Sequence, residues 1–171
     1  MMNSKIQDAF NEQLNAELFS SYLYLSMAAY FQSQNLKGMA HWMRMQEQEE
    51  NMHGMKFFDF INERGGRVAL DKIKEPKMEW SSPLDVFEDT CKHESKVTGL
   101  INDLVDLSVK EKDHAASGFL QWFVTEQVEE EATAQEIRDK LRLVSDNPVA
   151  LFMIDRELGQ RGAPATGPAR T

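Results

Sequence analysis

Six polar residues fall where four predicted helices should place apolar core side chains: Glu17, Glu50, His53, Glu94, Gln127 and Glu130. Each helix contributes one glutamate, while the histidine and the glutamine each lie three residues from a glutamate on the same helical face. A buried carboxylate carries a desolvation penalty of several kcal/mol unless a positive charge compensates it. Two divalent cations among the four glutamates would supply that charge.

The alternative interpretation is that these side chains face solvent or form buried salt bridges. For any single glutamate this is simpler, because Glu is rarely buried without a partner and a Glu-x-x-His pair also occurs by chance. However, no Lys or Arg occupies a predicted core position at this level. The helical rise also places each glutamate about 17 to 21 Å from one end of its helix, within about one turn of a common height. The pattern therefore favours a metal-binding layer.

The donor atoms of this layer would be carboxylate oxygens with a single imidazole nitrogen. Such a set suits iron, manganese or zinc, whereas calcium and magnesium are less suited to a histidine ligand. Cys91 lies one turn before Glu94, but one sulfur does not make a zinc or cluster site, so we predict a buried core cysteine. As the only cysteine in the chain, it also excludes an internal disulfide.

Apolar residues at three- and four-residue spacing predict four long helices and one short helix: 4–33, 37–64, 83–111, 114–144 and 147–160. Local signals agree with these bounds: Ser4 as an N-cap, Gly65 and Gly66 as a stop, Ser82 before Pro83, and Asn147 before Pro148. The third helix is predicted to bury a continuous seam: Phe87, Cys91, Glu94, Thr98, Ile101, Val105 and Ser108.

The segment 65–82 has no helical period and contains two glycines and Pro76, so we predict an extended connection. At about 3.3 Å per residue it could run the full length of a neighbouring helix. Two helical hairpins joined by one long crossover make an all-α, up-down-down-up four-helix bundle, to which the fifth helix is an appendage. We expect one domain over 1–161 and a disordered tail over 162–171.

The overall composition excludes several classes of function. A formal net charge of -9 disfavours nucleic acid as a partner and favours cations. No apolar run approaches the roughly 20 residues needed to cross a bilayer, and the N-terminus lacks the pattern of a secretion signal. We therefore expect a cytoplasmic protein that is not inserted in a membrane.

At these residues the chain closely resembles the bacterial and archaeal non-haem ferritins. The similarity extends from the stretch NEQLNAELFSSYLYL (11–25) to FMIDREL (152–158). The resemblance implies that Glu17, Glu50 and His53 bind one iron and that Glu50 bridges to a second iron. The second iron is then bound by two further glutamates and lies beside one amide: Glu94, Glu130 and Gln127.

The resemblance also implies a third iron position at Glu49, Glu126 and Glu129, with Glu130 shared. From the residues alone, ordinary surface acids beside the seam are the favoured interpretation. Tyr24 lies two turns after Glu17 on the same face. The resemblance gives it a role as an electron donor in oxygen reduction, while a packed tyrosine with a hydrogen-bonded hydroxyl is the alternative.

Other aromatic and sulfur side chains are predicted to be structural. Trp122 matches the family but is expected in the core, and His41, His93 and His114 are expected at the surface. Related bacterioferritins carry a second Glu-x-x-His, where this chain has Gln127 and Glu130 instead. Their haem-ligating methionine precedes the site histidine by two residues, whereas Met52 precedes His53 by one and points about 100° away, so no haem is expected.

The resemblance implies an iron-storage protein that oxidises Fe(II) with dioxygen and keeps Fe(III) mineral inside a hollow homo-oligomer of 24 copies. Exposed apolar residues such as Tyr22, Tyr30 and Trp80 would be compatible with contacts between copies. Two alternatives remain open at this point. One is a di-metal oxygenase or peroxide-destroying enzyme without storage, and the other is a metal-free bundle whose polar layer fixes helix register.

Overall fold

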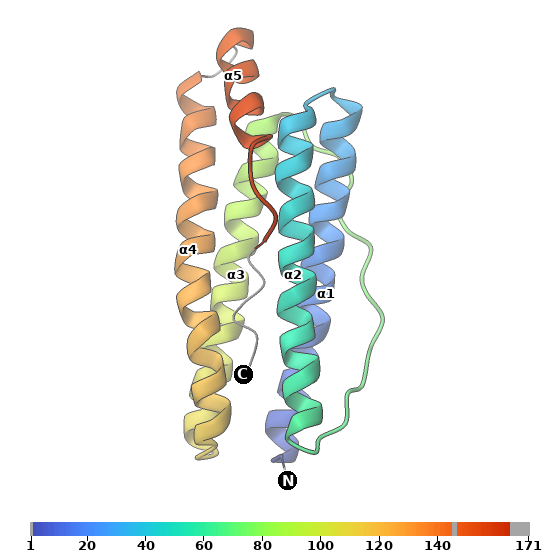
Figure 1. The fold of residues 1–171 in the computed structure, drawn as a ribbon, viewed down its shortest axis with the longest axis vertical. Coiled ribbons are helices and arrows are strands. Elements are labelled where there is room, and N and C mark those ends of the chain that lie inside the picture. Colours follow the sequence, from blue (N-terminus) through green and yellow to red (C-terminus); the bar gives the residue numbers. More distant parts are fainter. Residues whose placement is uncertain (1, 145–146, 165–171) are drawn as a thin grey trace.

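The computed structural model describes residues 2–144 and 147–164. Within these ranges the chain forms five helices: α1 (Ser4–Ser33), α2 (Lys37–Glu63), α3 (Pro83–Lys110), α4 (His114–Val144) and α5 (Pro148–Leu158). The four long helices lie side by side, and α5 sits at one end of them (Figure 1). The predicted all-α architecture is confirmed, and each predicted helix end lies within two residues of the observed one.

Helix ends follow local side-chain chemistry. The Ser82 hydroxyl accepts a hydrogen bond from the backbone N–H of Asp85, directly before Pro83 at the start of α3. The Asn147 side chain likewise accepts the N–H groups of Val149 and Ala150 at the start of α5. These two predicted caps are confirmed.

One predicted cap is wrong. α1 is capped by Asn3, whose side-chain oxygen accepts the N–H of Lys5, and Ser4 is already the first helical residue. Asn caps helices at least as well as Ser does, and here it stands one residue earlier. At the predicted glycine stop, α2 ends at Glu63 and Gly65 adopts a φ of 67°, a conformation that glycine reaches without strain.

The crossover 64–82 runs along the outside of α1 and joins the far end of α2 to the start of α3 (Figure 1). The Asn11 side chain holds its backbone by donating to the Arg67 carbonyl at 3.0 Å and accepting the Ala69 N–H at 2.8 Å. Further along, the Ser26 hydroxyl donates to the Lys77 carbonyl at 2.7 Å. The crossover makes α2 and α3 run in the same direction, as the up-down-down-up topology requires.

Two apolar clusters fill the bundle, and the polar layer separates them along every long helix. One cluster includes Tyr24, Met43 and Phe87, and the other includes Phe10 and Phe57. On each long helix the polar residues of the layer come between the residues of the two clusters in sequence. The common height predicted from helical rise is therefore observed.

α3 keeps the predicted seven-residue repeat but differs at the positions in between. The repeat is buried as predicted at Phe87, Glu94, Ile101 and Ser108. Between them the core takes Thr90, Val97 and Leu104. The three residues that were predicted to be buried at these positions are only half-buried: Cys91, Thr98 and Val105. The prediction of Cys91 as a core residue is therefore wrong, because the neighbouring Thr90 faces the interior.

Two residues predicted to be exposed are buried. Trp80 of the crossover lies across Tyr30 of α1, with ring centroids 5.4 Å apart, and its indole N–H donates to Asp89 at 3.0 Å. Burying both aromatic rings removes them from the surface available to other copies, whereas Tyr22 is exposed as predicted. Among the described residues, no helix combines the length and apolar composition that crossing a membrane requires. The predicted tail 162–171 lies outside the described residues from 165 onward.

Candidate metal centre

The structure brings the six predicted polar residues together at the middle of the bundle and buries all of them. They come from four helices: Glu17 from α1, Glu50 and His53 from α2, Glu94 from α3, and Gln127 and Glu130 from α4. Their exposed fractions run from 1% to 7%. Burial at this depth excludes the alternative in which these side chains face solvent.

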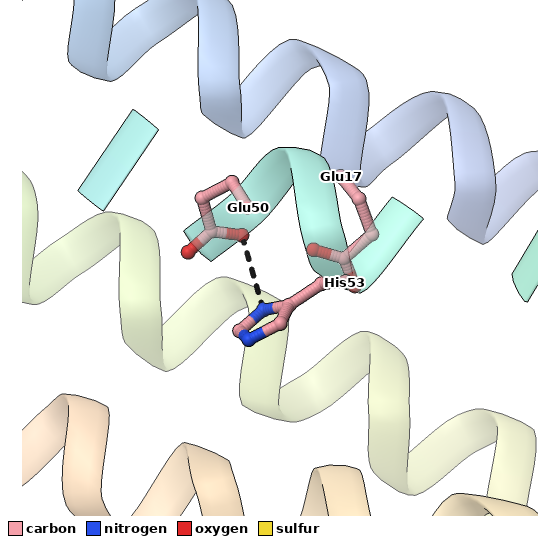
Figure 2. A group of neighbouring side chains, drawn as sticks. All are labelled: Glu17, Glu50 and His53. Carbon is pink, nitrogen blue, oxygen red and sulfur yellow. Dashed lines mark ion pairs between the residues drawn. The ribbon is translucent and has the colours of Figure 1, made fainter. Parts of the chain in front are cut away.

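Glu17, Glu50 and His53 form a compact trio. Each offers one ligand atom, and these three atoms lie within 4.8 Å of one another. His53 Nδ1 is 3.6 Å from Glu50 Oε2. Figure 2 shows the two carboxylates turned toward each other, with the imidazole beside them. Two oxygens and one nitrogen thus surround a space of the size that one metal ion needs.

The other half of the layer is arranged around Glu94 and Glu130. Glu94 accepts hydrogen bonds from the Tyr24 hydroxyl and, at 3.2 Å, from Gln127 Nε2. Glu130 accepts one from Gln46 Nε2 at 2.9 Å. Neutral donors therefore hold both carboxylates, and no guanidinium or ammonium of a described residue pairs with either.

Two buried amides belong to this layer although the sequence interpretation did not place them in the site. Gln46 precedes Glu50 by one turn and is fully buried. Gln13 precedes Glu17 by one turn and donates to its Oε1 at 2.8 Å. The signal that could have found both is a polar residue four positions before a seam glutamate on the same face.

Electrostatics at the centre disfavour four ionised carboxylates. Burial raises the pKa of Glu17 and Glu50 well above the ordinary value, and neighbouring carboxylates raise both further. Burial also raises the pKa of Glu94, and it raises the pKa of Glu130 to about 7. The causes at Glu50 include the charges of Glu94 and Glu130. Glu50 therefore interacts both with the trio that it forms with Glu17 and His53 and with the pair Glu94 and Glu130.

Unpartnered acceptor atoms point to the same need for positive charge. Within the described part of the chain, Glu17 Oε2 and Gln46 Oε1 are buried and accept no hydrogen bond. A buried acceptor without a donor is unfavourable. A cation bound among the glutamates would lower the pKa of each carboxyl and give the free oxygen of Glu17 a partner. The donor set present here therefore fits one or more divalent cations.

The predicted third group lies beside this centre at the surface. Glu49, Glu126 and Glu129 line one cleft between α2 and α4, of about 560 Å³, together with His53. Glu49 and Glu126 are half-buried and Glu129 is exposed. The cleft connects the buried imidazole of His53 to an acidic surface.

Trp122 and His93 differ from their predicted environments. Trp122 is 39% exposed, because the neighbouring Phe123 takes the core position on α4. Its ring meets His53 edge-on, with centroids 5.3 Å apart, and the Lys56 ammonium lies 4.3 Å from its centroid. His93 is half-buried with Nε2 2.8 Å from the Ser20 hydroxyl. Burial lowers the pKa of His93 to about 4.

Of the other two histidines predicted at the surface, one is exposed and one is half-buried. His114 is exposed at the start of α4. His41 is half-buried, and its Nε2 lies 2.8 Å from the backbone carbonyl of Arg161. The segment beyond α5 therefore contacts α2. Arg161 belongs to the predicted domain 1–161, and the predicted tail begins at the next residue.

Comparison with known proteins assigns this arrangement to a family. The ferritin-like domain matches residues 7–144, which include α2, α3, α4, all but the first three residues of α1, and the whole polar layer. The chain belongs to the ferritin-like family. The resemblance found in the sequence is confirmed, and the family fold agrees with the up-down-down-up bundle.

Similar ferritins cover nearly the whole chain. The bacterial non-heme ferritin of Bacteroides fragilis is 48% identical over 161 residues, which are 94% of this chain and 100% of that protein. The bacterial non-heme ferritin of a Staphylococcus epidermidis strain is 40% identical, covering 94% and 97%.

Solved structures of a ferritin from Archaeoglobus fulgidus are equally similar. Its open-pore form is 53% identical with a TM-score of 0.94, covering 95% of this chain and 100% of that one. A form engineered to be closed is 52% identical with a TM-score of 0.95, covering 96% and 100%. Identity and fold therefore agree over the same residues.

Proposed function

We propose that this chain oxidises Fe(II) with dioxygen at the centre of its bundle and that many copies store the Fe(III) product inside a hollow shell. The observation that carries the proposal is the set of four buried carboxylates that have no Lys or Arg partner among the described residues and only one imidazole, His53, beside Glu50. Similar proteins are named non-heme ferritins, which supports iron as the ion. Iron is here the substrate and the stored product.

The geometry supports two neighbouring iron positions. Glu17, Glu50 and His53 are the proposed ligands of the first, and Glu94 and Glu130 with Glu50 are those of the second. Glu50 contacts His53 and is also influenced by the charges of the second pair, which supports its role as the bridge. Two irons held a few Å apart can each give one electron to the same dioxygen molecule.

The protein residues favour oxidation through charge. Carboxylate oxygens bind the harder and more highly charged Fe(III) more strongly than Fe(II). Occupied positions also keep the four glutamates ionised, although burial alone raises their pKa values. Oxidation therefore strengthens the attraction between the ionised glutamates and the bound iron ions.

Tyr24 lies next to the second proposed position. It is fully buried, and its hydroxyl donates to Glu94. We propose that Tyr24 positions this carboxylate, and its phenol is also close enough to supply an electron during oxygen reduction. Replacement by Phe separates the two roles, because a positioning role alone predicts weaker metal binding, whereas electron donation predicts unchanged binding with altered oxygen chemistry.

The two positions are unequal, which supports release of the product. The second position has Gln127 and Glu130 where related di-iron proteins carry a second Glu-x-x-His, so it lacks the nitrogen donor and the first carboxylate of that motif and offers less binding energy to Fe(III). The cleft lined by Glu49, Glu126 and Glu129 opens beside His53, and the charge of Glu49 also acts on Glu130. We propose that these acids form a third iron position through which Fe(III) leaves toward the store.

Storage requires association of many copies. Three apolar residues of α5 are about two-thirds exposed in the isolated chain: Val149, Phe152 and Met153. Clustered apolar surface of this kind is typical of contacts between subunits. We propose a homo-oligomeric shell of 24 copies in the cytoplasm, with α5 at contacts between copies.

The deciding experiment is size-exclusion chromatography of the native protein after aerobic loading with Fe(II), with iron counted per particle. We expect a large particle that contains far more iron than three positions per chain could hold. A monomer or dimer that retains only two or three irons per chain and turns over an organic substrate would instead indicate a catalytic di-iron enzyme without storage.

A further inference from the structure

The segment 159–164 beyond α5 turns back and runs beside α2 (Figure 1). Its position is fixed by close contacts at the start of α2. Asp155 of α5 accepts the backbone N–H of Met39 at 2.8 Å. Gly159 approaches Gly38 so closely that a Cβ atom on Gly159 would lie 3.2 Å from Gly38 Cα. The segment therefore leaves α5 in a defined direction, toward the middle of α2.

Arg161 is anchored on α2 at three points. Its backbone carbonyl lies 2.8 Å from His41 Nε2. Its guanidinium carbon lies 4.6 Å from the centroid of the Trp42 ring. Its Nη2 donates to Glu49 Oε2 in an ion pair whose side chains are only 22% and 17% exposed. Such a partly dehydrated, charge-assisted pair is stronger than an exposed one.

The same Glu49 carboxylate faces the acidic cleft. Glu49, Glu126 and Glu129 line that cleft, and Pro164 of the same C-terminal segment lies at its edge. An arginine is positively charged at every physiological pH, so changes in pH do not release it from Glu49. A metal ion that binds both oxygens of Glu49 must therefore displace the guanidinium, and one that binds Oε1 alone is repelled by the positive charge on the same carboxylate.

We propose that Arg161 is an internal competitor that sets the metal affinity of the third position at Glu49, Glu126 and Glu129. This inference rests on the proposed function and concerns a residue outside the bundle that the sequence interpretation assigned no role. While Arg161 is paired with Glu49, the third position has one available carboxylate fewer and one positive charge nearby. The two central positions, whose glutamates do not contact Arg161, fill first, and the third fills only at higher metal concentration.

The inference can be tested without any oxidation step. Zn²⁺ is titrated by calorimetry into the metal-free assembled protein, and the affinities of the tighter and weaker sites are compared between the wild type and Arg161→Gln. Removing the competing charge should tighten the weaker class roughly three- to tenfold, the scale of one partly exposed ion pair, and leave the tighter class unchanged. Arg161→Lys keeps the charge but loses the planar fork, so an intermediate affinity is expected.

Arg67→Gln is the matched control. Arg67 is exposed on the crossover and does not line the acidic cleft, and its replacement changes the net charge by the same amount. Equal effects of Arg67→Gln and Arg161→Gln, or no effect of either, would overturn the inference. In a Glu49→Gln background the Arg161→Gln change should have no further effect, because the carboxylate for which metal and guanidinium compete is gone.

Failure of the inference is distinguishable from failure of the proposed function. Glu49→Gln should remove the weaker class of sites, whereas His53→Ala should remove part of the tighter class. If no weaker class depends on Glu49, the role of Arg161 is refuted while the central site stands. If His53→Ala leaves the tighter class intact, the proposed central site is itself wrong.

Discussion

At the scale of single residues, the four central glutamates make the metal-free bundle sensitive to pH. Their pKa values are raised in the folded protein, mainly by burial, and that of Glu130 rises from 4.5 to about 7. The folded state therefore binds more protons than the unfolded chain between these pH values. The stability that Glu130 contributes is fully present below about pH 4.5 and is lost as the pH rises through about 7. The raised pKa values of the other three glutamates change stability in the same direction.

We predict that the melting temperature of the metal-free protein falls between pH 5 and pH 8. Glu130→Gln should raise it at pH 8, because an uncharged amide avoids a penalty of roughly 3 kcal/mol for the shift at Glu130. Thermal unfolding in a chelating buffer at several pH values measures both effects. Glu12→Gln, an exposed change on α1, should leave the pH dependence as in the wild type.

Added metal should reverse this trend. Metal competes with protons for the same carboxylates, so metal affinity should increase as the pH rises through about 7. Titrating Zn²⁺ at pH 6 and pH 8 and following the melting temperature measures this. A melting temperature that is unaffected by Zn²⁺ at both pH values would instead support the metal-free, register-fixing interpretation of the layer.

His53 supplies the single nitrogen donor of the trio, so its loss should weaken the first iron position. We predict that His53→Ala slows the absorbance rise after Fe(II) addition by at least about tenfold, the scale seen when support for a metal ligand is lost. Stopped-flow absorbance measures the rate, and size-exclusion chromatography checks that assembly is intact. His114→Ala, at an exposed position, serves as the control and should oxidise Fe(II) at the wild-type rate.

The polar layer could be predicted from the sequence because each glutamate interrupts an otherwise apolar seam. The position of Trp122 could not, since Phe123 beside it is equally suited to the core and only packing selects between them. Gln46 and Gln13 were missed for a different reason. An amide has no charge that demands an explanation, and their spacing of four residues before Glu50 and Glu17 was overlooked until their hydrogen bonds to glutamates were seen.

At the scale of elements, α5 is attached to the bundle through the start of α2. A Cβ atom on Gly38 would lie 1.6 Å from the Asp155 carbonyl oxygen, which is a backbone atom that cannot move without displacing α5. The Asp155 side chain also accepts the N–H of Met39. The contact therefore requires glycine at position 38.

We predict that Gly38→Ala separates α5 from α2 and lowers the melting temperature, at a cost of at least about 2 kcal/mol from steric overlap. Thermal unfolding measures the loss, and limited proteolysis reports whether α5 becomes accessible. The control is Gly99→Ala on α3, where no atom lies within 4 Å of the added methyl group. There alanine should be neutral or stabilising by roughly 0.5–1 kcal/mol, because it favours the helix.

Helix bounds were predictable because their signals are local, as at Pro83 and Gly65. The rotation of α3 was not, because neighbouring residues such as Thr90 and Cys91 are both small enough and apolar enough for a core. Only packing against other helices decides between them. The path of the segment 159–164 depends on contacts with residues more than 100 positions away, and it lacks a periodic pattern.

At the scale of the whole molecule, the exposed apolar residues of α5 should be covered by other copies. We predict that Phe152→Asp weakens assembly, because it replaces a ring that is 66% exposed in one chain with a charge that must be desolvated at a contact. Light scattering should show a shift toward smaller species. Gln121→Glu adds the same charge at an exposed position of α4 and should leave the particle mass unchanged.

If the particle mass is unaffected by Phe152→Asp, α5 does not lie at a subunit contact. The isolated chain could predict that copies associate but not their number, since copy number depends on angles between copies. Tyr30 and Trp80 illustrate the difficulty, because the crossover covers both rings within one chain.

The proposed ligands are divided between the two helical hairpins. α1 and α2 supply Glu17, Glu50 and His53, while α3 and α4 supply Glu94 and Glu130. Ions bound between them would cross-link the halves of the molecule, so the arrival of substrate would tighten the protein that is about to react with it. Departure of the oxidised ions would then remove the cross-link between the two hairpins. The bundle would therefore become more rigid when iron binds and more flexible when iron leaves.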